Sequence, residues 1–184
     1  MDSKEYSIIK KSDWIITSWS GGTTSQLFIY PAESDFKNGN YQLRISIASV
    51  EVETSTFTPL KDVNRTLLVL EGNLSLSHKN QHSSVLKQYD QDSFSGNWQT
   101  SSIGKVLDFN VMTKGNTKSE VRMINVSEET ILTCLKDDFI HVLEGHLSID
   151  DATVNRKESL QISIKSKKLV LSQESRIVLV RTTF

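Results

Sequence analysis

Two pairs of polar residues alternate with apolar residues along two segments of the sequence. Arg44 and Ser46 fall on one side of YQLRISIASVEV, and Asp108 and Asn110 fall on one side of KVLDFNVM. An unpaired charge is costly when it points inward from a strand. These side chains therefore face solvent, form a buried Arg–Asp brace, or line a pocket of apolar walls with a few convergent polar groups. Because the arginine fork matches a carboxylate, the pocket reading predicts a small anionic ligand.

The stretch WSGGTTS at 19–25 places two glycines beside several hydroxyl side chains. A phosphate-binding loop needs a lysine after its glycines and a helix behind it, and a serine nucleophile elbow needs a strand-to-helix turn. No lysine follows here, and the next residues, SQLFIYP, read as a strand. The pattern instead predicts a strand entry whose glycines let the backbone pass close to a neighbour. We expect Trp19, Thr23 and Thr24 at the mouth of the barrel or sandwich that the strands form.

The four histidines do not form the cluster that a metal site on a β-barrel requires, commonly a His-x-His pair with glutamate on adjacent strands. His78 and His82 lie near a hairpin tip, at a spacing that is not close on a strand, and His141 and His146 bracket a second turn. A site formed by the second pair with Glu144 is the alternative. We predict structural or surface histidines, no metal and no other cofactor.

Composition narrows the class of protein. The chain has 184 residues, enough for one domain or two small fused units, and 37% are hydrophobic. Lys and Arg number 21 against 22 Asp and Glu, a balance that disfavours nucleic-acid or membrane partners. We find no signal peptide and no apolar window of the roughly 18 residues that span a bilayer, which predicts a cytoplasmic protein. Cys134 is the single cysteine, and its alternating surroundings indicate a buried structural thiol in a reducing compartment.

Most apolar residues alternate with polar ones, and strand-like segments recur every eight to twelve residues, which predicts an all-β sandwich or barrel. The candidate helical pieces are short, namely Ser3–Lys10 and a turn near Pro59–Val63. The segment VLEGNLSL at 69–76 recurs as VLEGHLSI at 142–149, with six of eight positions identical. Each copy reads as strand, glycine turn and strand, so we predict a duplicated β-barrel within one chain.

A series of short motifs resembles the HutD/Ves family of bacterial proteins. WSGGTTSQL, LRISIA, F-x-P followed by NR, LEG, F-x-G and DFNVM occur in the family's order across 14–113. The resemblance implies an all-β bicupin, that is, two cupin-like (RmlC-like) barrels or sandwiches in one chain. The N-terminal half would span 1–113 and a shorter C-terminal half 114–184, packed as a single unit. For some members a regulatory role in histidine utilisation, binding an intermediate such as formylglutamate, has been suggested.

Carried over motif by motif, the resemblance supports a set of ligand-binding positions on the first half of the chain: Trp19, Thr23, Thr24, Arg44, Ser46, Arg65, Asp108 and Asn110. The sequence also departs from the family pattern. Ser25 and Gln26 stand where members often have Arg and Glu, and Asn97 stands where they have an acid. These departures remove charged groups near the expected pocket.

From these observations we favour a non-catalytic protein that binds a small carboxylate-type metabolite in a regulatory role. Arg44 would bind the anion, and Asp108 would orient Arg44 or receive a ligand amine. Two other classes stay open. One is a cupin-type enzyme, either a metal-dependent oxygenase or a metal-free isomerase or lyase using Asp108 or Glu71 as acid/base. The other is a structural or protein-interaction module, and association into a homo-oligomer through a β edge is a further alternative.

Overall fold

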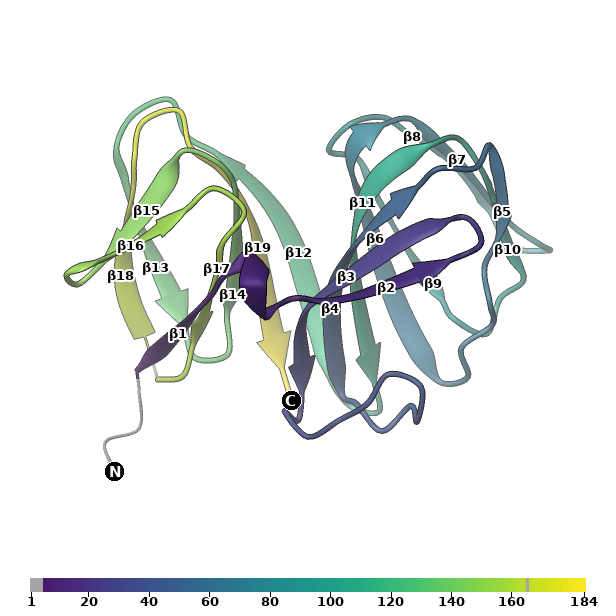
Figure 1. Ribbon diagram of the computed structural model, residues 1–184, viewed down its shortest axis with the longest axis horizontal. Coiled ribbons are helices and arrows are strands. Elements are labelled where there is room, and N and C mark those ends of the chain that lie inside the picture. Colours follow the sequence, from purple (N-terminus) through teal and green to yellow (C-terminus); the bar gives the residue numbers. More distant parts are fainter. Residues whose placement is uncertain (1–4, 165) are drawn as a thin grey trace. The chain divides into compact units, whose positions relative to one another are not determined.

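In the computed structural model, residues 5–164 and 166–184 are described (Figure 1), and their regular elements are β-strands apart from one 3-10 turn at Lys11–Asp13. The all-β prediction is confirmed. Among the described residues, none belongs to a helix long and apolar enough to cross a bilayer.

The chain divides into two compact units. The central unit is Ile15–Thr117, and the terminal unit combines the residues up to Trp14 with Lys118–Phe184. The terminal unit is thus assembled from both ends of the sequence.

The central unit contains two sheets. The six-stranded sheet has the order β2-β3-β4-β11-β6-β9, and the four-stranded sheet has the order β5-β10-β7-β8. The strands are β2 (Ile15–Trp19), β3 (Gly22–Tyr30), β4 (Leu43–Val50), β5 (Thr54–Thr56), β6 (Val63–Gly72), β7 (Leu74–His78), β8 (Ser83–Leu86), β9 (Gln91–Ser95), β10 (Thr100–Ile103) and β11 (Val106–Lys114).

The terminal unit also contains two sheets, with the orders β1-β17-β14-β19-β12 and β13-β18-β15-β16. The strands are β1 (Tyr6–Ile9), β12 (Lys118–Asn125), β13 (Thr130–Leu135), β14 (Phe139–Glu144), β15 (His146–Ile149), β16 (Ala152–Asn155), β17 (Ser159–Ile162), β18 (Ser166–Leu171) and β19 (Arg176–Thr183).

The two units share one pairing scheme. β4 to β11 pair among themselves as β12 to β19 do, so that β11 lies between β4 and β6 just as β19 lies between β12 and β14. The repeated VLEG segments form the equivalent turns β6–β7 and β14–β15. Their glycines, Gly72 and Gly145, have φ of 89° and 71°, a conformation that glycine adopts without strain. The predicted duplication is confirmed.

Each unit has its own apolar core. In the central unit, residues such as Leu67, Leu76 and Phe94 from both sheets are buried together. In the terminal unit, Ile140 and Leu179 pack with Cys134, which is fully buried as predicted. Burial raises the pKa of the Cys134 thiol to about 12, so the thiol stays protonated and serves as a small apolar side chain.

The helix expected at Ser3–Lys10 is wrong over its described part, since Tyr6–Ile9 forms β1. Tyr6 and Ile8 pack against the core of the terminal unit, and β1 pairs antiparallel with β17. A strand that finds its partner at the other end of the chain leaves little local signal, and its alternating Tyr6 and Ile8 outweigh the helical propensity of the polar residues before it. Ser3 and Lys4 lie outside the described residues.

Candidate functional site

Polar side chains from three neighbouring strands gather on one face of the six-stranded sheet. Met112 on β11 pairs with Arg44 on β4 and with Arg65 on β6. Two residues earlier, Asn110 pairs with Ser46. Directly paired residues in an antiparallel sheet point to the same face. The structure therefore brings together five of the predicted positions, including Asp108, which lies one further step along β11.

Arg44 is held by side chains on both sides. Its Nε donates to Gln26 Oε1 at 2.8 Å, and its Nη1 donates to Ser46 Oγ at 3.3 Å. The guanidinium lies 4.0 Å from the centre of the Phe36 ring, and Arg44 is only 7% exposed. Gln26, one of the departures from the family pattern, is thus a positioning partner of the arginine.

Arg65 is bound on one edge and unsatisfied on the other. Its Nη2 donates to Asn110 Oδ1 at 3.1 Å, and Asn110 Nδ2 in turn donates to Asp108 Oδ1. The guanidinium lies 4.7 Å from the Phe57 ring and 5.2 Å from the Phe94 ring. Its Nε is buried without a hydrogen-bond partner. An unsatisfied buried donor costs about 1–3 kcal/mol, so this atom is suited to a ligand acceptor.

The charges of this group do not balance. Burial raises the pKa of Asp108 to about 7, against the opposing effect of Arg65, so near neutral pH this carboxyl is ionised for only part of the time. Burial lowers the pKa of Arg65 to about 10, opposed by Asp108 and Tyr41, and burial also lowers the pKa of Arg44. Both guanidiniums remain charged at neutral pH. Two cations therefore face one half-neutralised acid.

The predicted entrance residues are only partly brought to this group. Thr24 pairs with Ala48, which pairs with Asp108, so Thr24 shares their face of the sheet. Thr23 is the adjacent position on β3 and points to the other face. Trp19 ends β2 and is 40% exposed.

The two glycines of WSGGTTS allow close approaches, as predicted. A Cβ at Gly21 would lie 2.1 Å from Cζ3 of Trp19, and a Cβ at Gly22 would lie 1.8 Å from the backbone oxygen of Ser49. Gly22 therefore lets β3 approach β4 more closely than any side chain permits.

At the equivalent positions of the terminal unit, the charged side chains neutralise one another. Glu120 pairs with Arg181, whose Nε and Nη2 donate to Asp138 at 3.0 and 2.8 Å. Asp138 is fully buried and also accepts the backbone N–H of Leu135 at 2.8 Å. Here the cation has a bidentate carboxylate partner.

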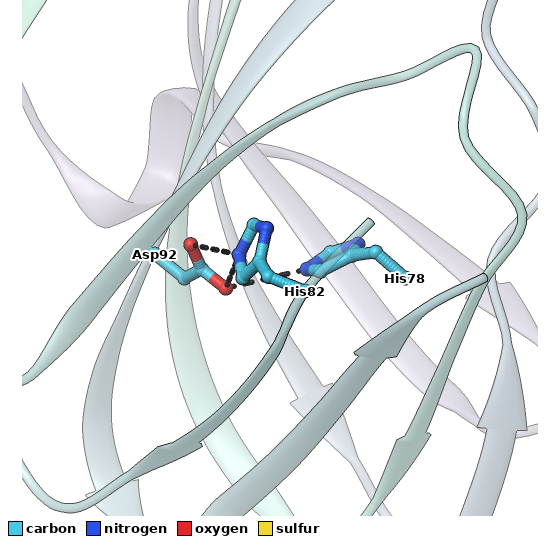
Figure 2. Close-up of side chains that lie close together, drawn as sticks. All are labelled: His78, His82 and Asp92. Atoms are coloured by element: carbon cyan, nitrogen blue, oxygen red, sulfur yellow. Dashed lines mark hydrogen bonds and ion pairs between the residues drawn. The ribbon is translucent and has the colours of Figure 1, made fainter. Parts of the chain in front are cut away.

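A second cluster, which the sequence did not predict, lies in the central unit. His78, His82 and Asp92 converge in Figure 2, with both Nε2 atoms directed at the carboxylate. The Nε2 of His78 lies 3.2 Å from Asp92 Oδ2, and the Nε2 of His82 lies 3.0 Å from each carboxylate oxygen. The sequence alone does not indicate Asp92, because β9 pairs with β6 in one sheet whereas the two histidines belong to the β7–β8 hairpin of the other sheet. The four-residue spacing of the histidines across a turn was the available signal.

A shallow open groove also runs along β5 and β10. It is lined by Thr54, Ser55, Thr56, Ser101, Ser102 and Ile103. None of these side chains is ionisable, so the groove offers no charge with which to select a ligand.

The comparisons with known proteins agree on the fold. The HutD family model matches residues 11–181. No curated protein matches the sequence significantly. A conserved protein of unknown function, PA5104 from Pseudomonas aeruginosa PAO1, has a TM-score of 0.85 at 17% identity, with 98% of this chain and 100% of that chain covered.

Two further solved structures are similar. HutD from Pseudomonas fluorescens SBW25, solved in a formate condition, has a TM-score of 0.77 at 17% identity, covering 97% of this chain and 98% of that one. The bacterial pirin YhhW from Escherichia coli, in complex with nickel(II), has a TM-score of 0.70 at 10% identity, covering 95% and 97%. At these identities the likeness shows the fold, which is a bicupin as expected.

Proposed function

This chain belongs to the HutD family, and on that premise we propose that it binds a small carboxylate at the Arg44–Arg65 group in a regulatory, non-catalytic role. The observation that carries the proposal is the buried, unpartnered Nε of Arg65 beside a second buried guanidinium. A ligand carboxylate would satisfy that donor and reduce the excess positive charge.

The chemistry of the site favours a carboxylate over a neutral ligand. A guanidinium presents donors in a planar fork that matches the two oxygens of a carboxylate. The polar groups stand among aromatic walls, Phe36, Phe57 and Phe94, which lower the local dielectric and strengthen each charged hydrogen bond. In this scheme Asp108 would accept a ligand N–H, as expected for an amino-acid derivative.

The duplicated unit supports the same reading. The equivalent row of the terminal unit carries Arg181 with its own carboxylate partner, Asp138. In the central unit that carboxylate position is occupied by Arg65. Replacing a structural anion by a second cation costs stability unless an external anion compensates it.

A second candidate function is proton-transfer catalysis by Asp108. Its pKa of about 7, raised by burial, suits a general acid/base at neutral pH. Glu71, the other acid considered, is exposed, which leaves it without the burial that tunes a catalytic acid. If Asp108 catalyses turnover, Asp108→Asn abolishes product formation while substrate still binds. If the role is binding alone, bound carboxylates are recovered unchanged from both proteins.

The test is calorimetric titration with a carboxylate series, together with the thermal shift that binding to the folded state produces. Formate, the smallest carboxylate, is the first probe, followed by acetate, glutamate, formylglutamate and urocanate. We expect saturable binding by at least one acid. Arg65→Lys keeps the charge and removes the fork, and Arg44→Gln removes the charge; each should weaken binding by about tenfold or more.

Arg122→Gln is the matched control, because Arg122 pairs with exposed Glu120 in the terminal unit. It should bind the same acid with unchanged affinity. The proposal fails if no acid shifts the melting temperature at millimolar concentration, or if Arg65→Lys and Arg44→Gln bind as the parent does while melting normally.

A further inference from the structure

The geometry of the second cluster points to a metal site, and we propose that His78, His82 and Asp92 bind one divalent transition-metal ion of the zinc and nickel type. This site is separate from the proposed carboxylate site and does not depend on it. Two imidazoles and one carboxylate are a donor set that borderline metals accept, whereas calcium and magnesium prefer oxygen ligands.

The three ligands come from elements that the fold holds close together. His78 is the last residue of β7, His82 lies in the turn to β8, and Asp92 is on β9. The backbone N–H of His78 donates to the carbonyl of His82 at 2.9 Å, which fixes the turn between them. β9 is anchored independently by its pairing with β6, where Asp92 lies opposite Leu67. The donors therefore converge from two elements with little freedom.

The distances suit an ion placed between the donors. The three candidate ligand atoms lie within 4.8 Å of one another, and the nitrogen–oxygen separations are 3.0 and 3.2 Å. Two donors at about 2.0–2.2 Å from a tetrahedral ion are separated by about 3.3–3.6 Å, slightly more than the separations present here. The side chain of His82 is the exposed one, so its ring is the donor that would adjust to complete the site.

The hydrogen-bond partner of the inner His78 nitrogen also suits a metal ligand. His78 Nδ1 lies 2.8 Å from Thr100 Oγ1, and the Thr100 hydroxyl is directed at the carbonyl of Trp98, 3.5 Å away. With the ring proton on Nδ1 and donated to Thr100, His78 would present the lone pair of Nε2 toward Asp92, as a metal ligand must. The 3.2 Å separation of Nε2 from the carboxylate oxygen leaves both atoms directed at one point, where a bound ion would be held.

Outer contacts orient the donors in the manner of established metal sites. Ser84 Oγ donates to Asp92 Oδ2 at 2.6 Å, and Thr100 holds the inner imidazole. Partners of this kind fix the orientation of metal ligands. The Trp98 ring lies edge-on to both imidazoles, 5.6 Å from His78 and 5.7 Å from His82. It covers the cluster with an apolar wall.

The three proposed ligands differ in their exposure to solvent. The His78 side chain is fully buried and Asp92 is 11% exposed, whereas His82 is 43% exposed. An ion can enter past His82 and meet a rigid inner pair. Three protein ligands leave one coordination position for water or an exogenous ligand, as in catalytic rather than structural zinc sites.

The experiment uses untagged full-length protein stripped with a chelator and then titrated with Zn²⁺ and with Co²⁺. We expect one ion per chain by calorimetry, and for Co²⁺ the visible absorption bands of a low-symmetry, near-tetrahedral site. His82→Ala and Asp92→Asn should each weaken binding by more than about 100-fold, beyond the 10–100-fold loss that outer partners cause.

His146→Ala is the matched control, since His146 is an exposed histidine of the terminal unit. It should bind as the parent does. His82 is exposed and Asp92→Asn preserves shape, so both variants should keep the parent's circular dichroism spectrum, which separates lost ligands from lost fold. The inference is overturned if the parent binds no ion more tightly than His82→Ala, or if His146→Ala loses the site as well.

Discussion

Arg65 and Asp138 occupy equivalent positions in the two units, and they carry opposite charges. The repeat that aligns Val69 with Val142 also aligns these two residues, 73 positions apart. Asp138 receives two hydrogen bonds from Arg181, whereas Arg65 shares its row with Met112 and Arg44. The same position of the duplicated sheet therefore has two different roles. In the terminal unit Asp138 forms an ion pair, whereas in the central unit Arg65 has no carboxylate opposite it on the neighbouring strand.

Removing Arg181 should strongly destabilise the terminal unit. Arg181→Met leaves the fully buried carboxylate of Asp138 without its bidentate partner, which typically costs about 3–5 kcal/mol. Arg122→Met, which breaks only the exposed pair with Glu120, should leave the stability close to that of the parent, because water and salt screen such a pair. Urea unfolding of both variants measures the difference. Equal losses would show that the buried pair does not hold the unit together.

The stability of the protein should depend on pH through Asp108. Its pKa is about 7 when folded and about 4 in an unfolded chain, so the folded state binds the extra proton between these values. Relative to high pH, the proton on Asp108 therefore adds to the free energy of unfolding below about pH 4. This contribution decreases as the pH rises from about 4 to about 7, and it is absent at higher pH. Urea titrations near pH 5 and pH 8 should show this slope in the parent and a flatter one in Asp108→Asn. Parallel slopes would contradict the assignment.

Carboxylate affinity should increase as the solution is acidified from pH 8 to pH 6. Across this window Asp108 gains its proton, while the ligand stays ionised and the pKa of Arg65, about 10, keeps its guanidinium charged. Loss of one negative charge beside the anion should tighten binding by up to about tenfold, the equivalent of one pKa unit. Calorimetry at both ends of the window measures it, with Asp108→Asn as the pH-independent reference. Weaker binding at pH 6 would place the anion elsewhere.

Gly22→Ala should disturb the start of β3. The new methyl group would lie 1.8 Å from the backbone oxygen of Ser49, so β3 and β4 must separate. We expect a loss above about 2 kcal/mol, or roughly 4–8 °C in melting temperature. Gly115→Ala is the comparison, because no atom lies within 4 Å of its Cβ and only its φ of 66° opposes the change, at about 1 kcal/mol. A smaller effect at Gly22 than at Gly115 would exclude the close approach.

Cys134 should resist thiol reagents until the terminal unit opens. The sulfur is fully buried, and burial raises its pKa to about 12, so the reactive thiolate is scarce. Labelling of the native protein by an aromatic disulfide reagent should follow the unfolding rate, while the chain in denaturant reacts at once. Rapid labelling under native conditions would show local opening around β13.

Much of the fold follows from local pattern. The alternation around Arg44 and Asp108 identifies β4 and β11, and the repeated VLEG turn identifies the duplication. The same alternation indicated that Arg44, Ser46, Asp108 and Asn110 share faces, because period two fixes side-chain direction within a strand. The sequence does not show which face of a strand is buried, because that depends on the neighbouring strands. Here the face of β4 that carries Arg44 is the same face of the sheet as Arg65 on β6.

The remaining features depend on long-range pairing. Asp92 contacts His78 and His82 only because β9 joins β6 and the β7–β8 turn reaches over it, which no spacing along the chain reveals. β1 gives little local signal for the same reason, since its partner β17 lies far along the sequence. Trp19 and Thr23 were placed with the site by motif proximity, yet Thr23 points to the opposite face from Thr24.

The connectivity of the terminal unit sets the order in which the protein can be completed during synthesis. Ser7 and Gln161 pair although they are 154 positions apart in the sequence, whereas every strand of the central unit lies between Ile15 and Thr117. A chain emerging from the ribosome can close the central unit first, while β1 waits for the last third of the message to be translated. During that interval the apolar side chains of β1 are without their partners. β1 can therefore pair only after β17 has been made, and β19, the last strand to be synthesised, then completes the sheet between β14 and β12.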